Sequence, residues 1–84
     1  MSTFDKVKAK ILSTPTANDF TAKEIQNFLS KYGFICKHVN GSHYIYHFPG
    51  DKKTLVLTIP MHSPVKPAYI DHIRKCILEI EGDK

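Results

Sequence analysis

The residues most able to do chemistry in this chain form the tripeptide Gly41-Ser42-His43, between two strand-like runs. Histidine is the side chain that most readily takes up or gives a proton near neutral pH. A nucleophilic Ser42 would need an adjacent base, whereas neighbouring strand residues point to opposite faces. The chain also lacks a Gly-x-Ser-x-Gly nucleophile elbow. We therefore expect His43 to carry any proton transfer, and Ser42 to bind a phosphate or fix the turn.

Two other histidines extend this pattern. His47 lies about 13 Å further along the strand than His43, at roughly 3.3 Å per residue, which is too far for one metal ion to bind both. His62 follows the third strand, whose end approaches the start of the second strand in an antiparallel meander, so we expect it near His43. Such a pair beside lysines suits acid–base cleavage of RNA, in which cations stabilise the phosphorane. The alternative is a loop histidine that caps backbone groups.

Length and composition limit the protein class. The chain has 84 residues, 42% of them hydrophobic, which suffices for one domain with a modest core. No run approaches the roughly 20 apolar residues of a membrane span, and the N-terminus has no apolar signal region, so we expect a cytoplasmic protein. Cys36 and Cys76 stand outside any Cys-x-x-Cys pair, so no zinc site is predicted. The chain also lacks an obvious motif for another metal or a cofactor, and none is expected.

The charge distribution favours a polyanionic partner. The formal net charge is +4, and residues 1–78 carry 11 Lys and Arg against 5 Asp and Glu, because acidic residues gather at the C-terminus. Nucleic acid is the expected partner of such a chain. The alternative is a basic surface that serves only solubility.

Three helices are predicted from apolar spacing and end signals. Apolar residues at helical spacing predict a short helix over 3–13. A capping box from Thr21 to Glu24 begins the second helix, and Gly33 suits the left-handed position after its end. Pro67 suits the first turn of the last helix.

Between the second and third helices the pattern predicts three strands, over 34–39, 42–48 and 54–59. Asn40-Gly41 predicts a type I′ turn, with positive φ at both residues. The second strand's aromatic face is either the core or a platform for a base or cation. The expected fold class is α+β, ordered α-α-β-β-β-α, with a three-stranded antiparallel sheet and helices on one face. Alternation places Tyr44, Tyr46 and Phe48 on one face, and His43, Ile45 and His47 on the other.

Over about residues 18–80 the chain resembles the HicA toxins of bacterial toxin–antitoxin systems. The Gly-Ser-His core is short, but its register with a preceding Gly-Phe and a later Pro-x-His makes the resemblance specific. The matching segments are Phe20–Ile25, Gly33-Phe34, Asn40–Tyr46, Thr58–His62 and Val65–Pro67.

This resemblance implies an mRNA interferase with a fold like that of double-stranded-RNA-binding domains (dsRBD-like). The family's catalytic histidine falls on His43, and the implied partners are mRNA and a HicB-like antitoxin that covers the active site. Gly41, Ser42 and His62 are the expected RNA contacts. Basic residues are common just before the family's Gly-Ser-His, and Lys37 is their candidate substitute here. The implied division is an N-terminal helical extension and loop, 1–17, and a HicA-like domain, 18–84.

Three functions remain open at this point. The first is a metal-independent endoribonuclease in which His43 is the general acid or base. The second is a non-catalytic RNA-binding module of the same fold, which would read phosphates and 2′-hydroxyls. The third is a protein-interaction domain, whose binding would lack the steep salt dependence of phosphate contacts.

Overall fold

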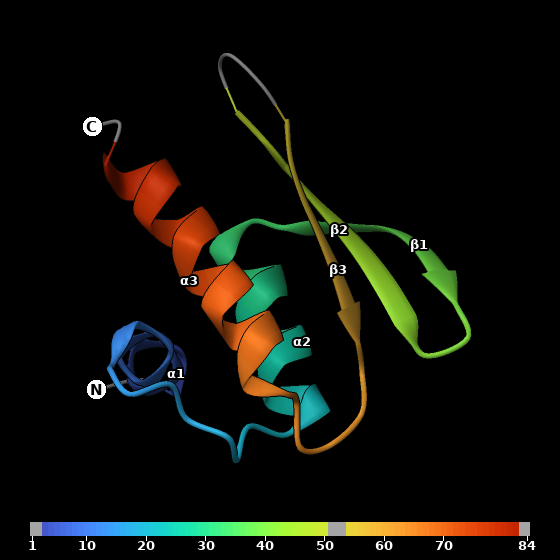
Figure 1. Ribbon diagram of the computed structural model, residues 1–84. Helices are drawn as coiled ribbons and strands as arrows, with labels where there is room; N and C mark the ends of the chain where they lie inside the picture. Colours follow the sequence, from blue (N-terminus) through green and yellow to red (C-terminus); the bar gives the residue numbers. More distant parts are fainter. Residues whose placement is uncertain (1–2, 51–53, 83–84) are drawn as a thin grey trace.

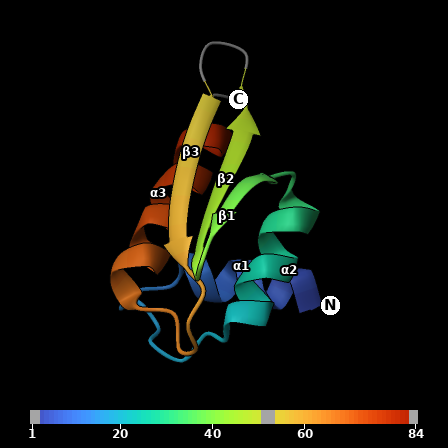
Figure 2. The ribbon, with the colours of Figure 1, turned by 90° about the vertical axis from the view of Figure 1, so that its right-hand side faces the viewer.

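The computed structural model describes residues 3–50 and 54–82 and contains three helices and one antiparallel sheet. The helices lie on one side of the sheet and leave the other side open, as the sequence predicted (Figures 1 and 2). The α-α-β-β-β-α order is likewise confirmed, and the strands follow one another across the sheet as β1-β2-β3. The elements are α1 (Thr3–Leu12), α2 (Ala22–Tyr32), β1 (Ile35–Asn40), β2 (His43–Pro49), β3 (Thr54–Pro60) and α3 (Pro67–Gly82).

Both ends of α2 are closed as the sequence predicted. The Glu24 N–H donates to Thr21 Oγ1 at 3.1 Å, and the Thr21 N–H donates to Glu24 Oε1 at 2.9 Å. Gly33 has φ 119°, and its N–H donates to the Leu29 carbonyl at 3.2 Å. A Cβ at Gly33 would lie 3.3 Å from the Phe48 ring, so both its conformation and its packing favour glycine. These caps fix where the chain leaves α2 and enters β1.

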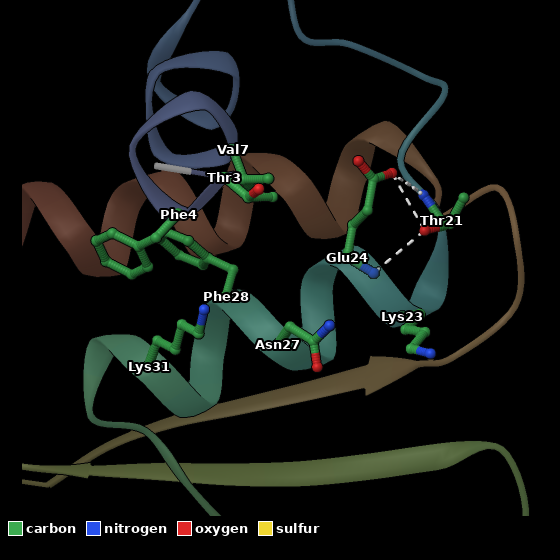
Figure 3. A pocket seen from close by; sticks show the side chains of 9 residues that line it. All are labelled: Thr3, Phe4, Val7, Thr21, Lys23, Glu24, Asn27, Phe28 and Lys31. Atoms are coloured by element: carbon green, nitrogen blue, oxygen red, sulfur yellow. Dashed lines mark hydrogen bonds between the residues drawn. The ribbon is translucent and has the colours of Figure 1, made fainter. Parts of the chain in front are cut away.

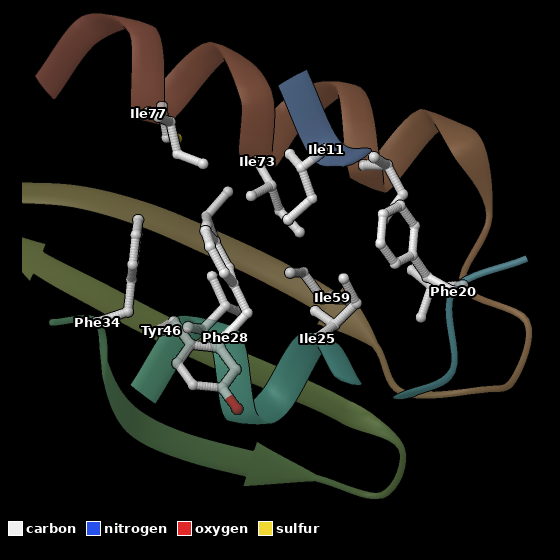
Figure 4. Packing of buried hydrophobic residues seen from close by; sticks show 14 of the residues in the cluster. Ile11, Phe20, Ile25, Phe28, Phe34, Tyr46, Ile59, Ile73 and Ile77 are labelled. Atoms are coloured by element: carbon white, nitrogen blue, oxygen red, sulfur yellow. The ribbon is translucent and has the colours of Figure 1, made fainter. Parts of the chain in front are cut away.

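The core lies between the sheet and the helices (Figure 4). Strand alternation aims every second side chain of β2 and β3 into it, so that Tyr46, Leu57 and Ile59 are buried. The aromatic face of β2 is therefore part of the core, which was the first of the two interpretations of that face. Tyr44 and Phe48 pack at the edges of the same cluster.

Helix α1 belongs to the same core, although the sequence suggested a separate extension. Val7 and Ile11 are buried against the rest of the cluster, and the Phe4 and Phe28 rings stack with centroids 5.0 Å apart. Arg74 of α3 donates to the Ile11 carbonyl at 3.0 Å and to the Ser13 carbonyl at 3.1 Å. These bonds satisfy carbonyls that the end of a helix leaves without partners. The division at residues 17 and 18 stays a prediction.

Two lysines of α1 are used in holding this helix in place. Lys8 Nζ lies 2.7 Å from Glu81 Oε2, which also accepts a hydrogen bond from Tyr32 Oη at 2.7 Å. Lys10 Nζ lies 2.8 Å from Asp19 Oδ1 and keeps the pKa of that carboxyl below its usual value. The positive charges of Lys8 and Lys10 are therefore partly compensated within the protein.

Tyr46, which is buried, and Tyr32, which is partly buried, predict a loss of stability in alkali. Burial, with a smaller contribution from Cys36 and Tyr44, raises the pKa of Tyr46 from 10.0 to about 12. Burial and the Glu81 hydrogen bond also raise the pKa of Tyr32. Because the unfolded chain loses these protons first, stability is intact below pH 10 and declines as pH rises toward 12. Urea unfolding of wild type and Tyr46→Phe at pH 8, 10 and 11.5 should show a shallower decline in the variant. Parallel declines would contradict this, and Tyr69→Phe controls for loss of a hydroxyl.

Candidate functional site

The turn between β1 and β2 differs from the predicted one. Asn40 pairs with His43, so the two central residues are Gly41 and Ser42. Gly41 has φ 63°, and no other described residue except Gly33 has positive φ. Glycine with positive φ at the first central position fits a type II′ turn, and the predicted type I′ turn at Asn40-Gly41 is wrong. A bulge in β1 between Cys36 and His38 shifts the pairing by one residue, so that Asn40 rather than Val39 lies opposite His43.

His43 is the first residue of β2 and lies at one end of the sheet. Because Tyr44 and Tyr46 face the helices, alternation places the His43 side chain on the open face. The residue is exposed, and within the described residues its imidazole has no hydrogen bond or ion pair. Both ring nitrogens are therefore available to a bound molecule.

The end of β3 lies beside this turn, as the predicted meander required. His43 pairs with Pro60, and the Met61 N–H donates to the Ser42 carbonyl at 2.7 Å. The His62 N–H donates to the Pro60 carbonyl at 3.0 Å, which turns the chain away from the strand. His62 lies two residues after Pro60, the partner of His43 on β3, and its side chain is exposed.

Next to Pro60 lies a small pocket of about 110 Å³ that the sequence did not indicate. His62, Lys66 and Tyr69 line it together with Pro60 and Pro64. Lys66 directly precedes α3, and its carbonyl accepts from the Tyr69 N–H at 3.0 Å. The Lys66-Pro67 step was visible in the sequence, but only the folded chain brings this lysine to the same pocket as His62.

Lys37 lies further from the turn than its expected role requires. It occupies the bulge of β1, beside the middle of β2, and its side chain is exposed. Strand geometry puts its backbone roughly 10 Å from that of His43. The structure brings Gly41, Ser42 and His43 together with the start of the 61–66 loop, but it does not bring Lys37 beside them.

The open face of the sheet combines histidines with exposed apolar side chains. Cross-strand pairing aligns Ile35, His47 and Val56 in one row across the three strands. Ile35 is 47% exposed and Val56 is 48% exposed, so this row is a partly apolar surface. His38 pairs with Ile45 in the row between this one and His43.

The described residues contain neither a metal-binding cluster nor a membrane-spanning helix. In that part of the chain, no three His, Cys, Asp or Glu side chains are grouped so as to hold a metal ion. No helix there has the length and apolar character of a membrane span.

Together, the fold and this site define a small α+β protein with an exposed histidine at one end of an open sheet. Comparison with protein families identifies the family to which this chain belongs. Residues 22–77, about two thirds of the chain, match the model of the HicA toxin of bacterial toxin–antitoxin systems, and the chain belongs to that family. It is therefore a toxin of a toxin–antitoxin system, with a cognate antitoxin as its partner. No curated protein and no solved structure matches the chain. Helix α1 lies outside the matched region.

Proposed function

We propose that this toxin is a metal-independent endoribonuclease that cleaves mRNA in the cytoplasm and so inhibits translation. The observation that carries the proposal is the exposed His43 at the rim of the sheet in a HicA family chain. The neighbouring His62 and Lys66 supply groups that can bind a phosphate. A net charge of +4 is consistent with RNA as substrate.

The proposed reaction is an internal transfer within the RNA strand. The 2′-hydroxyl oxygen attacks the adjacent phosphorus, and the bond from phosphorus to the 5′-oxygen breaks. His43 either takes the proton from the 2′-hydroxyl or gives one to the leaving 5′-oxygen, and solvent water takes or gives the other proton. Ser42, the Gly41 backbone and His62 contact the phosphate, and Lys37 contacts a more distant part of the strand. The products are a 2′,3′-cyclic phosphate and a 5′-hydroxyl.

The proposed antitoxin is a HicB-like protein that covers His43. The open face supports this, because it presents exposed Ile35 and Val56 on the same side of the sheet as the histidine. Expression of the toxin alone should slow bacterial growth, and co-expression of the antitoxin should restore it.

The test of the proposed activity is cleavage of single-stranded RNA by the purified protein in EDTA. The expected result is cleavage with 2′,3′-cyclic phosphate ends. RNA left intact over hours, at a protein concentration that binds it, would contradict the proposal.

A non-catalytic RNA-binding module is the second candidate. One observation favours it: within the described residues no carboxylate contacts His43 to orient its ring. Protection of duplex RNA from an added nuclease, without cleavage products, would support this alternative.

A further inference from the structure

A groove lies between α1 and α2, on the helical side of the protein and not on the open face of the sheet (Figure 3). Phe4 and Val7 of α1 and Phe28 of α2 form its apolar part. Its volume is about 220 Å³, below the roughly 300–1,000 Å³ of pockets that hold drug-sized molecules. A groove of this volume suits one planar group, such as an unpaired base. The α1 side of the groove lies outside the matched family region.

Polar residues at one-turn intervals line the α2 side of the groove. Lys23, Asn27 and Lys31 follow one another at i, i+4 and i+8, so the two lysines are about 12 Å apart along the helix axis. Among residues 3–50 and 54–82, neither lysine pairs with a carboxylate, in contrast to Lys8 and Lys10. In Figure 3, Lys31 extends toward Phe28.

The groove also contains one acidic residue, and its role is structural. Glu24 Oε1 accepts hydrogen bonds from the Thr21 N–H at 2.9 Å and from Thr21 Oγ1 at 3.1 Å. Lys23, Lys31 and Glu24 together give the residues that line the groove a net charge of +1. An aromatic wall with uncompensated lysines at its edge is the combination that binds single-stranded nucleic acid, through base stacking and phosphate contacts.

We propose that this groove is a second RNA-binding site, in which one unpaired base of the substrate stacks on Phe4 while Lys23 and Lys31 contact phosphates on either side. Asn27 supplies an amide that can hydrogen-bond to the edge of the base. The inference rests on the proposed ribonuclease function and deepens it, because the groove holds the RNA strand at a distance from His43.

Two hydrogen bonds connect the part of the chain beside the turn site to the helix that lines the groove. The Ala22 N–H at the start of α2 donates to Ser63 Oγ at 2.8 Å, and Ser63 is the neighbour of His62. The Val65 N–H donates to the Phe20 carbonyl at 2.8 Å. These two bonds join the loop after β3 to the N-terminal end of α2, from which Lys23 follows directly. A strand bound at His43 and His62 can continue along this side toward the groove.

The experiment measures binding of a fluorescein-labelled 20-nucleotide single-stranded RNA to the inactive His43→Ala protein, by anisotropy over a range of salt concentrations. Adding Lys23→Gln and Lys31→Gln should weaken binding at least about fivefold. The slope of log affinity against log salt should fall by about 1.4, at about 0.7 per single-stranded phosphate contact. The matched control adds Lys6→Gln and Lys75→Gln, which change the net charge equally on exposed helix positions outside the groove.

A second variant tests the proposed stacking of the base on Phe4. Phe4→Leu keeps an apolar side chain against Phe28 but removes the stacking ring, so affinity should fall at least about fivefold, the lower end for one stacked base. Its melting temperature is measured alongside to establish that it folds. Equal losses of RNA affinity in the groove and control lysine variants, or no loss in either, would overturn the groove site. The proposed ribonuclease function would still stand in that case if the wild-type protein cleaved RNA. Wild type that neither binds nor cleaves RNA would overturn both.

Discussion

Replacing His43 with alanine is expected to lower the rate of RNA cleavage at least about 100-fold. General acid–base catalysis by one positioned side chain contributes about 10²–10⁴ in rate, and alanine can neither take nor give a proton. His43 is exposed at the start of β2, so the change removes no packing contact of the core. The measurement is the initial rate of cleavage of a labelled single-stranded RNA in EDTA.

His47→Ala is the matched control for that measurement. The two histidines lie on the same strand and on the same open face, four residues apart. A proton-transfer role confined to His43 leaves the His47 variant with most of the wild-type rate. Full activity of His43→Ala, or equal losses in both variants, would remove His43 from the proposed role. Circular dichroism of each protein excludes a loss that comes from unfolding.

Replacing Ile11 with alanine is expected to lower the free energy of unfolding by about 2–5 kcal/mol. The Ile11 side chain is 0% exposed and lies among residues of the other helices, so its removal leaves a cavity. A loss of this size is a large part of the roughly 5–15 kcal/mol that stabilises a typical domain. Urea unfolding followed by circular dichroism measures the change.

Lys6→Ala is the control on the same helix, because Lys6 is exposed and alanine favours a helix at least as well as lysine. Its stability should stay within about 0.5 kcal/mol of wild type. A protein shortened to residues 18–84 should be less stable than Ile11→Ala, since it also loses Val7 and Phe4 from the core. Equal stability of the shortened and full-length proteins would mean that the predicted boundary at residue 18 is a true domain boundary.

Local signals were sufficient to predict most of the elements. The Thr21–Glu24 capping box and Gly33 carry their information within a few residues, through side-chain hydrogen bonds and the φ freedom of glycine. The alternation of Tyr44 and Tyr46 with His43 and Ile45 was equally local, so the exposed face of β2 could be assigned before the fold was known.

The turn type could not be assigned in this way. Asn40-Gly41 is a strong type I′ signal by itself, but the turn's central residues depend on the pairing of the flanking strands. The bulge between Cys36 and His38 alters that pairing from several residues away. A feature set by cross-strand hydrogen bonds is not contained in the dipeptide.

The helices, the strands, the face of His43 and the resemblance to the HicA toxins could be predicted from local patterns, because each depends on neighbouring residues or on a short motif. The folded chain was needed to show that α1 is part of the core, that Lys66 and His62 line one pocket and that Lys37 lies away from the turn. The fold also determines which lysines form ion pairs. Lys8 and Lys10 pair with carboxylates, whereas Lys23 and Lys31 pair with none among the described residues. These outcomes depend on contacts between residues far apart in the chain, whose geometry is set when the helices pack on the sheet.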